Sequence, residues 1–314
     1  MRRPILAVTL VTAALLLAGC GSSGDGGDGD QATIRIAGNS NAAALPVWVG
    51  AEHGFFEKCG VDAKYTLIEN ISTLPSALGK SFDIALSVPP LLITAADQGI
   101  PIQEVAGATL NTRENPQTFL VAPKGSDIKS VEDLEGKTLG VQTITGSTHL
   151  GTKMWLKKAG VPYDSVKIVQ VDGPAQADQL KAGRIDAVET LAPFSTSILK
   201  LGDSIIDPQS SIAPEVSGIF WTASPKWAKD NKDALECFRN GLDDAREFIE
   251  GNEEEAKAVL QKQTGLPDDI VADTVLPTYT SDVRPDDLGK WLNAMKEVGG
   301  FTGGVDVTSL VVEN

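Results

Sequence analysis

The sequence is poor in histidine and lacks the short motifs of common hydrolases and metalloenzymes. Only His53 and His149 occur in 314 residues, and no G-x-S-x-G, H-E-x-x-H or paired-cysteine metal spacing is present. A hydrolase needs a nucleophile with a base beside it. These absences therefore argue against an exported enzyme, and we expect neither a metal nor another cofactor.

The sequence also lacks a hydrophobic run long enough to cross a bilayer. The apolar run at residues 5–17 is shorter than the roughly 20 residues that a spanning helix needs. It follows two arginines and ends in Leu-Ala-Gly before Cys20, which is typical of a secretory signal. The end of this run resembles the lipobox of bacterial lipoproteins, in which Cys20 becomes the lipidated first residue. The alternative is an ordinary cleaved signal with an incidental cysteine.

Apolar residues are missing from residues 21–31, GSSGDGGDGDQ. Such a segment has nothing to bury and is predicted to be a flexible tether. We therefore expect a lipoprotein signal peptide at residues 1–19, a tether at 20–31 and a folded body from Ala32. The resemblance implies an exported protein, lipid-anchored to the outer face of the cell membrane.

Positive charge is in deficit. The chain has 27 Lys and Arg against 42 Asp and Glu, a formal net charge of −15. The charge becomes −17 when the two positive charges of Arg2 and Arg3 leave with the signal. Such a surface binds nucleic acid poorly and favours a soluble, self-repelling body. We expect no nucleic-acid partner.

Cysteine is scarce, and beyond Cys20 only Cys59 and Cys237 remain. In an exported protein an even pair is a disulfide candidate. Helical periodicity, however, places Cys237 opposite the apolar stripe of its helix, where a structural cysteine is less common. A Cys59–Cys237 disulfide and two separate free thiols both stay open.

Residues 137–160 are the stretch around which the chain is organised. They read as a strand, a loop of small residues at 145–148, and a helix that Gly160 ends. Small residues let backbone N–H groups reach a ligand, and a helix N-terminus adds unpaired donors and partial positive charge. The alternative is that Ser147 or Thr148 only caps its own helix.

Strands and helices alternate along the rest of the chain. This alternation predicts an α/β fold with a mainly parallel sheet. The expected strands are 33–38, 61–68, 82–86, 100–106, 118–122, 139–141, 166–171, 185–189 and 219–223. The expected helices begin near 45 and cover 70–79, 91–98, 130–134, 148–159, 174–182, 193–201, 225–229, 232–250, 253–263, 268–275 and 285–298.

Two α/β units followed by a helical tail predict two lobes. We expect lobe I at residues 32–117 plus 222–314 and lobe II at 118–221, because the tail needs the first sheet to pack on. The chain then crosses between the lobes near 118–121 and 217–222. Two such crossings form a hinge, with the ligand site between the lobes.

Four segments resemble one family of transport proteins. They are LPVWVGAEHGFFEK at 45–58, FDIA at 82–85, SVEDLEGKTLGV at 130–141 and GRIDAV at 183–188. This pattern resembles the solute-binding proteins of ABC importers of the nitrate, aliphatic-sulfonate, taurine and thiamine-pyrimidine type. The resemblance implies a type II periplasmic-binding-protein fold, a two-lobed clamp with a two-strand hinge. It also implies a monomer that delivers a small solute to a membrane permease with a cytoplasmic ATPase.

The resemblance places the ligand-binding residues in four loops that follow predicted strands, where open α/β sheets bind ligands. The residues that it implies are Asn39, Ser40, Asn41 and Trp48; Ser87, Val88 and Pro89; Thr143, Thr145, Gly146, Ser147 and Thr148; and Glu189 to Phe194. Trp48 and Trp221 are suited to stacking on a flat ligand, but both residues are more often core. His149, at the start of a helix, is expected to be a neutral surface residue.

One departure from the family pattern concerns charge. Members often carry Trp-Glu-Pro or Val-Glu-Pro where this chain has Leu-Ala-Pro at 191–193. The carboxylate is missing, and Glu189 stands nearby. If Glu189 faces the cleft, it favours an amine or a ring N–H and opposes a sulfonate. The alternative is an exposed glutamate at a strand end.

Clamp closure is the expected mechanism, because a ligand held by one lobe gains contacts with the other only in the closed form. A sensor partner protein on the same fold stays an alternative. So does an exported enzyme, although the Cys-rich iron-binding run of the related eukaryotic pyrimidine synthases has no counterpart here.

Overall fold

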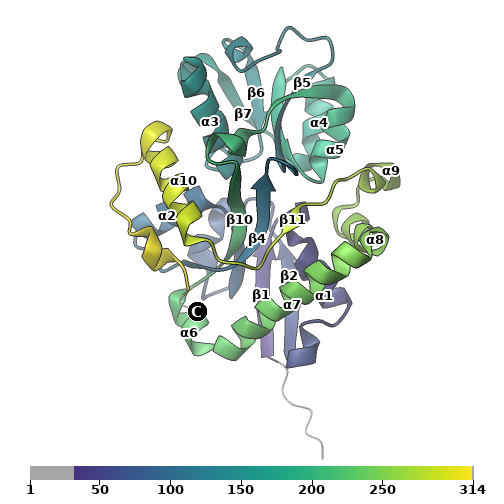
Figure 1. Cartoon of the computed structure of the whole chain (residues 1–314), viewed down its shortest axis with the longest axis vertical. Helices are drawn as coiled ribbons and strands as arrows, with labels where there is room; N and C mark the ends of the chain where they lie inside the picture. Colours follow the sequence, from purple (N-terminus) through teal and green to yellow (C-terminus); the bar gives the residue numbers. More distant parts are fainter. Residues whose placement is uncertain (1–31, 313–314) are drawn as a thin grey trace, which may run out of the picture. The chain divides into compact units, whose positions relative to one another are not determined.

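The computed structural model describes residues 32–312, which form two β-sheets with helices packed against them (Figure 1). The expected α/β class is confirmed. Within these residues, no helix combines the length and the apolar character needed to cross a membrane.

The larger sheet has six strands in the order β11-β4-β10-β3-β1-β2. Its strands are β1 (Ala32–Gly38), β2 (Val61–Leu67), β3 (Ile84–Ser87), β4 (Gln103–Thr112), β10 (Glu215–Ala223) and β11 (Thr278–Tyr279). The first three are parallel, whereas β10 runs antiparallel between β3 and β4. The prediction of a mainly parallel sheet is therefore wrong here, because the chain returns from the second sheet and inserts β10 in the opposite direction.

The smaller sheet has five strands in the order β7-β6-β8-β5-β9. Its strands are β5 (Thr118–Pro123), β6 (Thr138–Val141), β7 (Lys167–Gln170), β8 (Ala187–Leu191) and β9 (Gly202–Ile206). Strand β6 pairs in parallel with β7 and β8, and β5 pairs antiparallel with β8 and β9. Strand β9, at the edge of this sheet, was not predicted, because its first residues, Gly-Asp-Ser, have no apolar periodicity.

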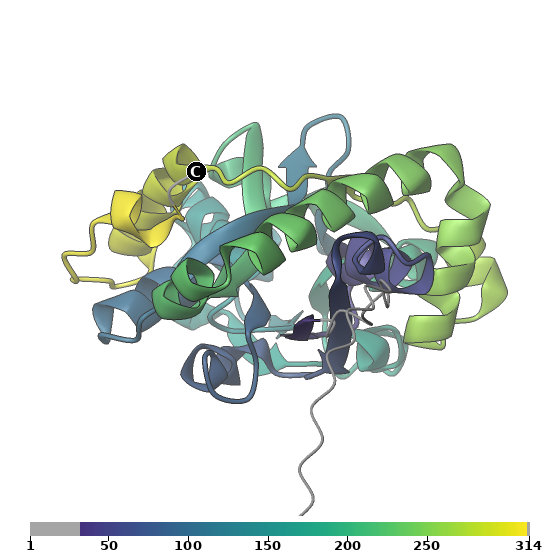
Figure 2. The same cartoon turned by 90° about the horizontal axis from the view of Figure 1, so that it is seen from below.

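Helices cover both faces of the larger sheet. One apolar cluster joins it to α1 (Leu45–Glu52), α6 (Pro225–Asp230), α7 (Lys232–Gly251), α8 (Glu253–Thr264) and α9 (Asp268–Ala272). Figure 2 shows α7, in green, running along this side with α1, in purple, beside it. A second cluster joins the opposite face to α2 (Pro89–Asp97) and α10 (Pro285–Val298). Helices of the C-terminal tail thus cover both faces of the larger sheet, as expected.

Helices α3 (Ser147–Ala159), α4 (Gly173–Lys181) and α5 (Phe194–Leu201) pack on the smaller sheet. Helix α3 ends as predicted at Gly160, whose φ of 73° is left-handed and strain-free only for glycine. Two expected short helices are 3₁₀ helices of narrower extent. Ile71–Thr73 and Pro75–Ala77 replace the single helix expected at 70–79, because Pro75 interrupts it, and Glu132–Leu134 lies within the expected 130–134.

The structure joins Cys59 and Cys237 in a disulfide, with their Cα atoms 5.8 Å apart. Cys237 is 3% exposed although it lies off the apolar stripe of α7. The reason is that Phe56 stacks on Phe238, with ring centroids 5.8 Å apart, and occupies the space that a side chain at Gly241 would need. The segment around Phe56 and Cys59 therefore covers this side of the helix.

The chain passes between the two sheets at residues 113–117 and again at 207–214. Both connections lie a few residues upstream of the expected crossings at 118–121 and 217–222. Strand β10 pairs with the larger sheet from Glu215 onward. The division into lobes at 117/118 and 221/222 stays a prediction.

Candidate ligand-binding site

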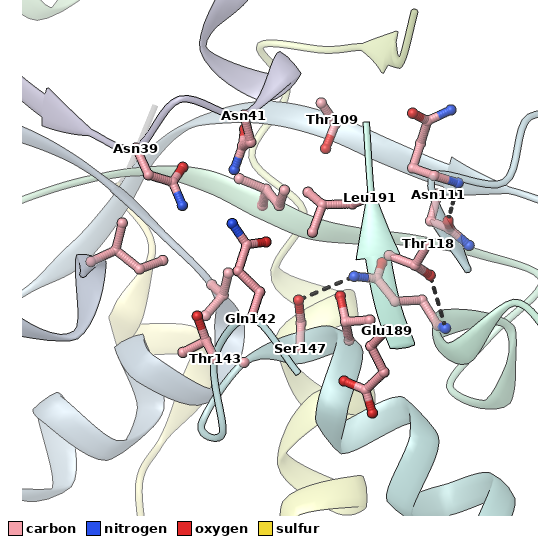
Figure 3. A pocket seen from close by; sticks show the side chains of 17 residues that line it. Asn39, Asn41, Thr109, Asn111, Thr118, Gln142, Thr143, Ser147, Glu189 and Leu191 are labelled. Carbon is pink, nitrogen blue, oxygen red and sulfur yellow. Dashed lines mark hydrogen bonds between the residues drawn. The ribbon is translucent and has the colours of Figure 1, made fainter. Parts of the chain in front are cut away.

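A cavity of about 60 Å³ lies where the carboxyl ends of several strands of both sheets meet (Figure 3). Most of its lining residues are polar, and they come from both sheets and from the connections between them. The lining residues are Asn39, Asn41, Ile71, Val88, Thr109, Asn111, Gln117, Thr118, Gln142, Thr143, Gly146, Ser147, Thr148, Glu189, Leu191, Gln209 and Ile219. The cavity is small beside the ~300–1,000 Å³ of pockets for drug-sized ligands.

The structure brings many of the predicted site residues to this cavity. Those in its lining are Asn39, Asn41, Val88, Thr143, Gly146, Ser147, Thr148 and Glu189. Those outside the lining are Ser40, Trp48, Ser87, Pro89, Thr145 and Phe194. Trp48 and Trp221 are both buried in the core of the larger sheet. Cys20 lies outside the described residues.

The wall formed by the larger sheet contains Asn39 and Asn41, which follow β1. Tyr65 Oη donates to the backbone oxygen of Asn39 at 2.7 Å, and burial raises the pKa of this hydroxyl. Asn41 Oδ1 accepts the Ala43 N–H at 2.8 Å and so fixes its own side chain. Asn39 Oδ1 is buried and has no protein partner. Both amides face the cavity in Figure 3, so Asn39 offers a free hydrogen-bonding group there.

The opposite wall is the N-terminus of α3. Gly146 is its N-cap residue, no side chain caps the helix, and its first turn carries no acid. Ser147 Oγ instead donates to the backbone oxygen of Gly218 at 3.1 Å. The alternative in which Ser147 or Thr148 caps the helix is thus wrong. The first N–H groups and the positive end of the helix dipole are left facing a cavity that Gly146, Ser147 and Thr148 line.

Glu189 and His149 form a buried pair behind this wall. Glu189 is 2% exposed, and its Oε1 lies 2.8 Å from His149 Nδ1. His149 Nε2 lies 2.8 Å from Tyr163 Oη, and burial raises the pKa of that hydroxyl, with Glu189 adding to the rise. The expectation of a surface histidine is wrong, because His149 is completely buried. The alternative of an exposed Glu189 is wrong too.

The charges around the cavity are few. Glu189 is the only ionisable residue in the lining, and neither lysine nor arginine occurs there. Lys153, one turn along α3 from His149, lies with its Nζ 4.4 Å from the centre of the Tyr163 ring, and burial lowers the pKa of its ammonium group. Within residues 32–312, no cluster of His, Cys, Asp or Glu is suited to hold a metal ion. The cavity therefore presents hydrogen-bonding groups, the N-terminus of α3 and one carboxylate.

One group of lining residues is not among those predicted from the sequence. These residues lie on or beside the two connections between the sheets and are Thr109, Asn111, Gln117, Thr118, Gln209 and Ile219. A weak signal was available, since Thr109 and Asn111 are polar residues within an otherwise apolar strand. No local pattern in the sequence points to Gln209.

The chain is similar in sequence to several known proteins. A family model described as NMT1/THI5 like matches residues 41–256. A putative ABC transporter periplasmic binding protein from Brachyspira hyodysenteriae is 25% identical over 68% of this chain and 65% of its own length. A putative thiamine biosynthesis protein from Haemophilus influenzae is 26% identical over 72% of this chain and 71% of its own. The chain thus spans slightly less than two thirds of the Brachyspira protein.

A solved structure shows the same fold. The alkanesulfonate-binding protein SsuA from Xanthomonas axonopodis pv. citri, bound to MOPS, superposes with a TM-score of 0.75 at 16% identity. The match covers 90% of this chain and 98% of the other. The expected periplasmic-binding-protein fold is confirmed.

Proposed function

The chain belongs to the NMT1/THI5-like family, and from this premise we propose that it is the extracytoplasmic solute-binding protein of an ABC importer. The observation that carries the proposal is the polar cavity between the two sheets, with Asn39 on one side and the uncapped α3 N-terminus on the other. Names of relatives that include a periplasmic binding protein and an alkanesulfonate-binding protein support it.

The cavity size and its donors limit the solute. A volume of about 60 Å³ favours a compact solute, or the compact head of a larger one. The free N–H groups at Gly146–Thr148 suit an oxyanion or a carbonyl group. Glu189, which also lines the cavity, is hydrogen-bonded to His149 and offers its carboxylate as an acceptor to a solute that carries an N–H group. We therefore propose nitrate, a sulfonate such as taurine, or a pyrimidine-like compound as the solute class.

Capture by hinge closure is part of the proposal. Hydrogen bonds connect residues on the side of the larger sheet with residues on the side of the smaller sheet. The Ala42 N–H donates to Ala192 O at 3.1 Å, and Thr196 Oγ1 lies 2.9 Å from Thr274 Oγ1. A solute that contacts both walls favours the form in which these bonds exist. To reverse an equilibrium from mostly open to mostly closed, it must prefer the closed form by about 5.5 kcal/mol.

Placement in the cell completes the proposal. A lipid on Cys20 holds the protein at the outer face of the cell membrane, where it passes its solute as a monomer to a permease and its ATPase. The sensor alternative uses the same site and is separated from import by uptake assays in cells. An enzyme on this fold finds less support, because Ser147 donates to Gly218 O and has no base as partner.

A thermal-shift screen of the full chain tests the proposal. The panel contains nitrate, methanesulfonate, taurine, cytosine and simple amines, and calorimetry follows each hit. We expect a hit in the wild type that Asn39→Ala with Ser147→Asp abolishes without unfolding the protein, because the aspartate places a negative charge at the α3 N-terminus. The matched control, Asn240→Ala with Ser204→Asp, changes exposed residues outside the cavity and keeps the wild-type affinity. Unchanged affinity in the first variant rejects the site.

A further inference from the structure

Both connections between the sheets converge on the carboxylate of Asp207, the residue after β9. Its Oδ1 accepts hydrogen bonds from Thr118 Oγ1 at 2.6 Å and from the Gln209 backbone N–H at 3.1 Å. Its Oδ2 accepts from Asn111 Nδ2 at 2.7 Å. Asn111 Oδ1 in turn accepts the Gln117 N–H at 2.7 Å. One carboxylate thus ties the end of β4, the start of β5 and the second connection together.

The side chain of Gln209 extends from this network into the cavity wall. Its Nε2 donates to Ser147 Oγ at 3.1 Å, the bond that a dashed line marks at Ser147 in Figure 3. Ser147 Oγ in turn donates to Gly218 O at 3.1 Å. The side chains of Gln209 and Ser147 are buried, each in a residue only 3% exposed. A Cβ at residue 218 would collide with the Gln209 carboxamide. The glycine in β10 therefore leaves the space that the Gln209 side chain occupies.

Helix α3, whose N-terminus faces the cavity, is fastened to the same connection. Trp155 Nε1 donates to Asp207 O at 3.1 Å, and Ser211 Oγ donates to Gly151 O at 3.0 Å. Pro208 O occupies the space that a Cβ at residue 151 would need. The helix cannot shift independently of the second connection without breaking these contacts.

We propose that Gln209 is a positioning residue that couples the ligand-binding end of α3 to both connections between the sheets. In this proposal, the Ser147 hydroxyl becomes ordered at the same time as the cavity closes. The inference rests on the proposed function, and it adds a residue that neither the sequence motifs nor the names of the relatives indicate. The proposal is based on the buried side-chain amide of Gln209. This amide can bond to Ser147 and pack against Gly218 only while the two connections keep their present arrangement.

A different role for Gln209, as a buried amide that only supports the fold, makes a different prediction. Gln176 serves as the comparison. It is also a buried glutamine, 1% exposed, and its Nε2 donates to Glu189 O at 2.8 Å, but it belongs to α4 and contacts neither connection through a hydrogen bond. If Gln209 only supports the fold, Gln209→Met and Gln176→Met should affect the protein alike. Methionine keeps the length of the side chain and removes its hydrogen bonds.

The experiment measures the distance between the two sheets by pulsed electron paramagnetic resonance on the full chain without added solute. Spin-labelled unnatural amino acids at the exposed positions 80 and 181 leave the Cys59–Cys237 disulfide intact. We expect a second distance population for Gln209→Met and a wild-type distribution for Gln176→Met. A wild-type distribution for Gln209→Met, or equal broadening in both variants, overturns the proposal.

Ser147→Ala provides a second route if Gln209→Met does not fold. It removes the same bond from the other partner, so the proposal predicts the same second population, and a wild-type distribution overturns it. Because no solute is present, the result does not depend on the solute screen. A failed screen rejects the proposed function alone, whereas unchanged distances reject the coupling alone.

Discussion

The polar side chains on the two sides of the cavity differ in their hydrogen bonds to other protein groups. On the side of the larger sheet, Asn39 Oδ1 has no protein partner, and neither does Ser87 Oγ nearby on β3. On the side of the smaller sheet, Ser147 is bonded to Gly218 and Gln209, and Glu189 is bonded to His149. These lining side chains of the second wall are thus bonded to protein groups, but its α3 N–H groups are free, while the first wall offers the unpaired amide oxygen of Asn39. Selectivity is therefore expected to depend on both the Asn39 acceptor and the α3 donors.

Two buried glutamates, one in each sheet, also differ in their partners. Glu104, in β4 of the larger sheet, is 1% exposed and has no partner for its Oε1. Burial raises the pKa of its carboxyl group to about 8. Glu189, in β8 of the smaller sheet, is 2% exposed and lies against His149. Glu104 thus keeps one buried oxygen without a hydrogen-bond partner, whereas Glu189 is paired with a histidine.

Breaking the Glu189–His149 pair should have the largest effect. His149→Leu leaves the Glu189 carboxylate buried without its partner, and removing one member of a buried pair typically costs about 3–5 kcal/mol. The free energy of unfolding in urea measures the loss. The matched control is the other histidine, His53, which lies 3.7 Å from the exposed Glu255, so His53→Leu is expected to cost less than about 1 kcal/mol. Equal losses in the two variants contradict the account.

Removing the disulfide should separate stability from binding. Cys59→Ser with Cys237→Ser opens a link with a sequence separation of 178 and is expected to cost about 2–4 kcal/mol of unfolding free energy. Neither cysteine lines the cavity, so solute affinity stays at the wild-type value. Calorimetry on the folded variant checks this, and a weakened affinity argues against independent roles.

The pH dependence of stability tests the buried Glu104 of the larger sheet. The pKa of Glu104 is higher in the folded state than in the unfolded chain, so its stabilising contribution is complete below the unfolded pKa. That contribution is lost as pH rises through about 8, at up to about 1.4 kcal/mol per pH unit. We expect Glu104→Gln to flatten the fall in stability between pH 5 and about 8. A profile identical to the wild type in urea melts refutes the assignment.

Asn39→Ala tests the open wall by itself. Because Asn39 Oδ1 bonds to no protein group, its loss should leave the unfolding free energy nearly unchanged. It removes one solute hydrogen bond, worth about 1.4 kcal/mol, or a tenfold weaker affinity. Calorimetry with the solute found in the screen gives the affinity, and thermal melts give the stability. The reverse pattern, lower stability at constant affinity, assigns Asn39 to the fold instead.

Local sequence signals were sufficient for most of the fold. The small loop at 145–148 and Gly160 predicted α3 to within a residue, because both features act within one turn of the helix. The long-range pairing of strands could not be seen in this way. The residues that insert β10 between β3 and β4 are apolar in either direction, so the pattern does not reveal that the strand runs antiparallel.

The site residues show the same difference between local sequence signals and long-range packing. Asn39 and Asn41 lie just after β1, Ser147 ends the loop that follows β6, and their positions are implied by the family pattern. His149 and Glu189 are 40 residues apart, and their pairing depends on how α3 packs against β8. Gln209 lies in a connection whose sequence carries no motif. Interactions made by tertiary packing were therefore missed, even where the residues themselves had been considered.

Native mass spectrometry of the purified full chain tests the central claim most directly. The account predicts that the wild type retains a small molecule that denaturation releases, and that Asn39→Ala with Ser147→Asp retains none. Retention of the same molecule in equal amount by both proteins would contradict a solute site between the two sheets.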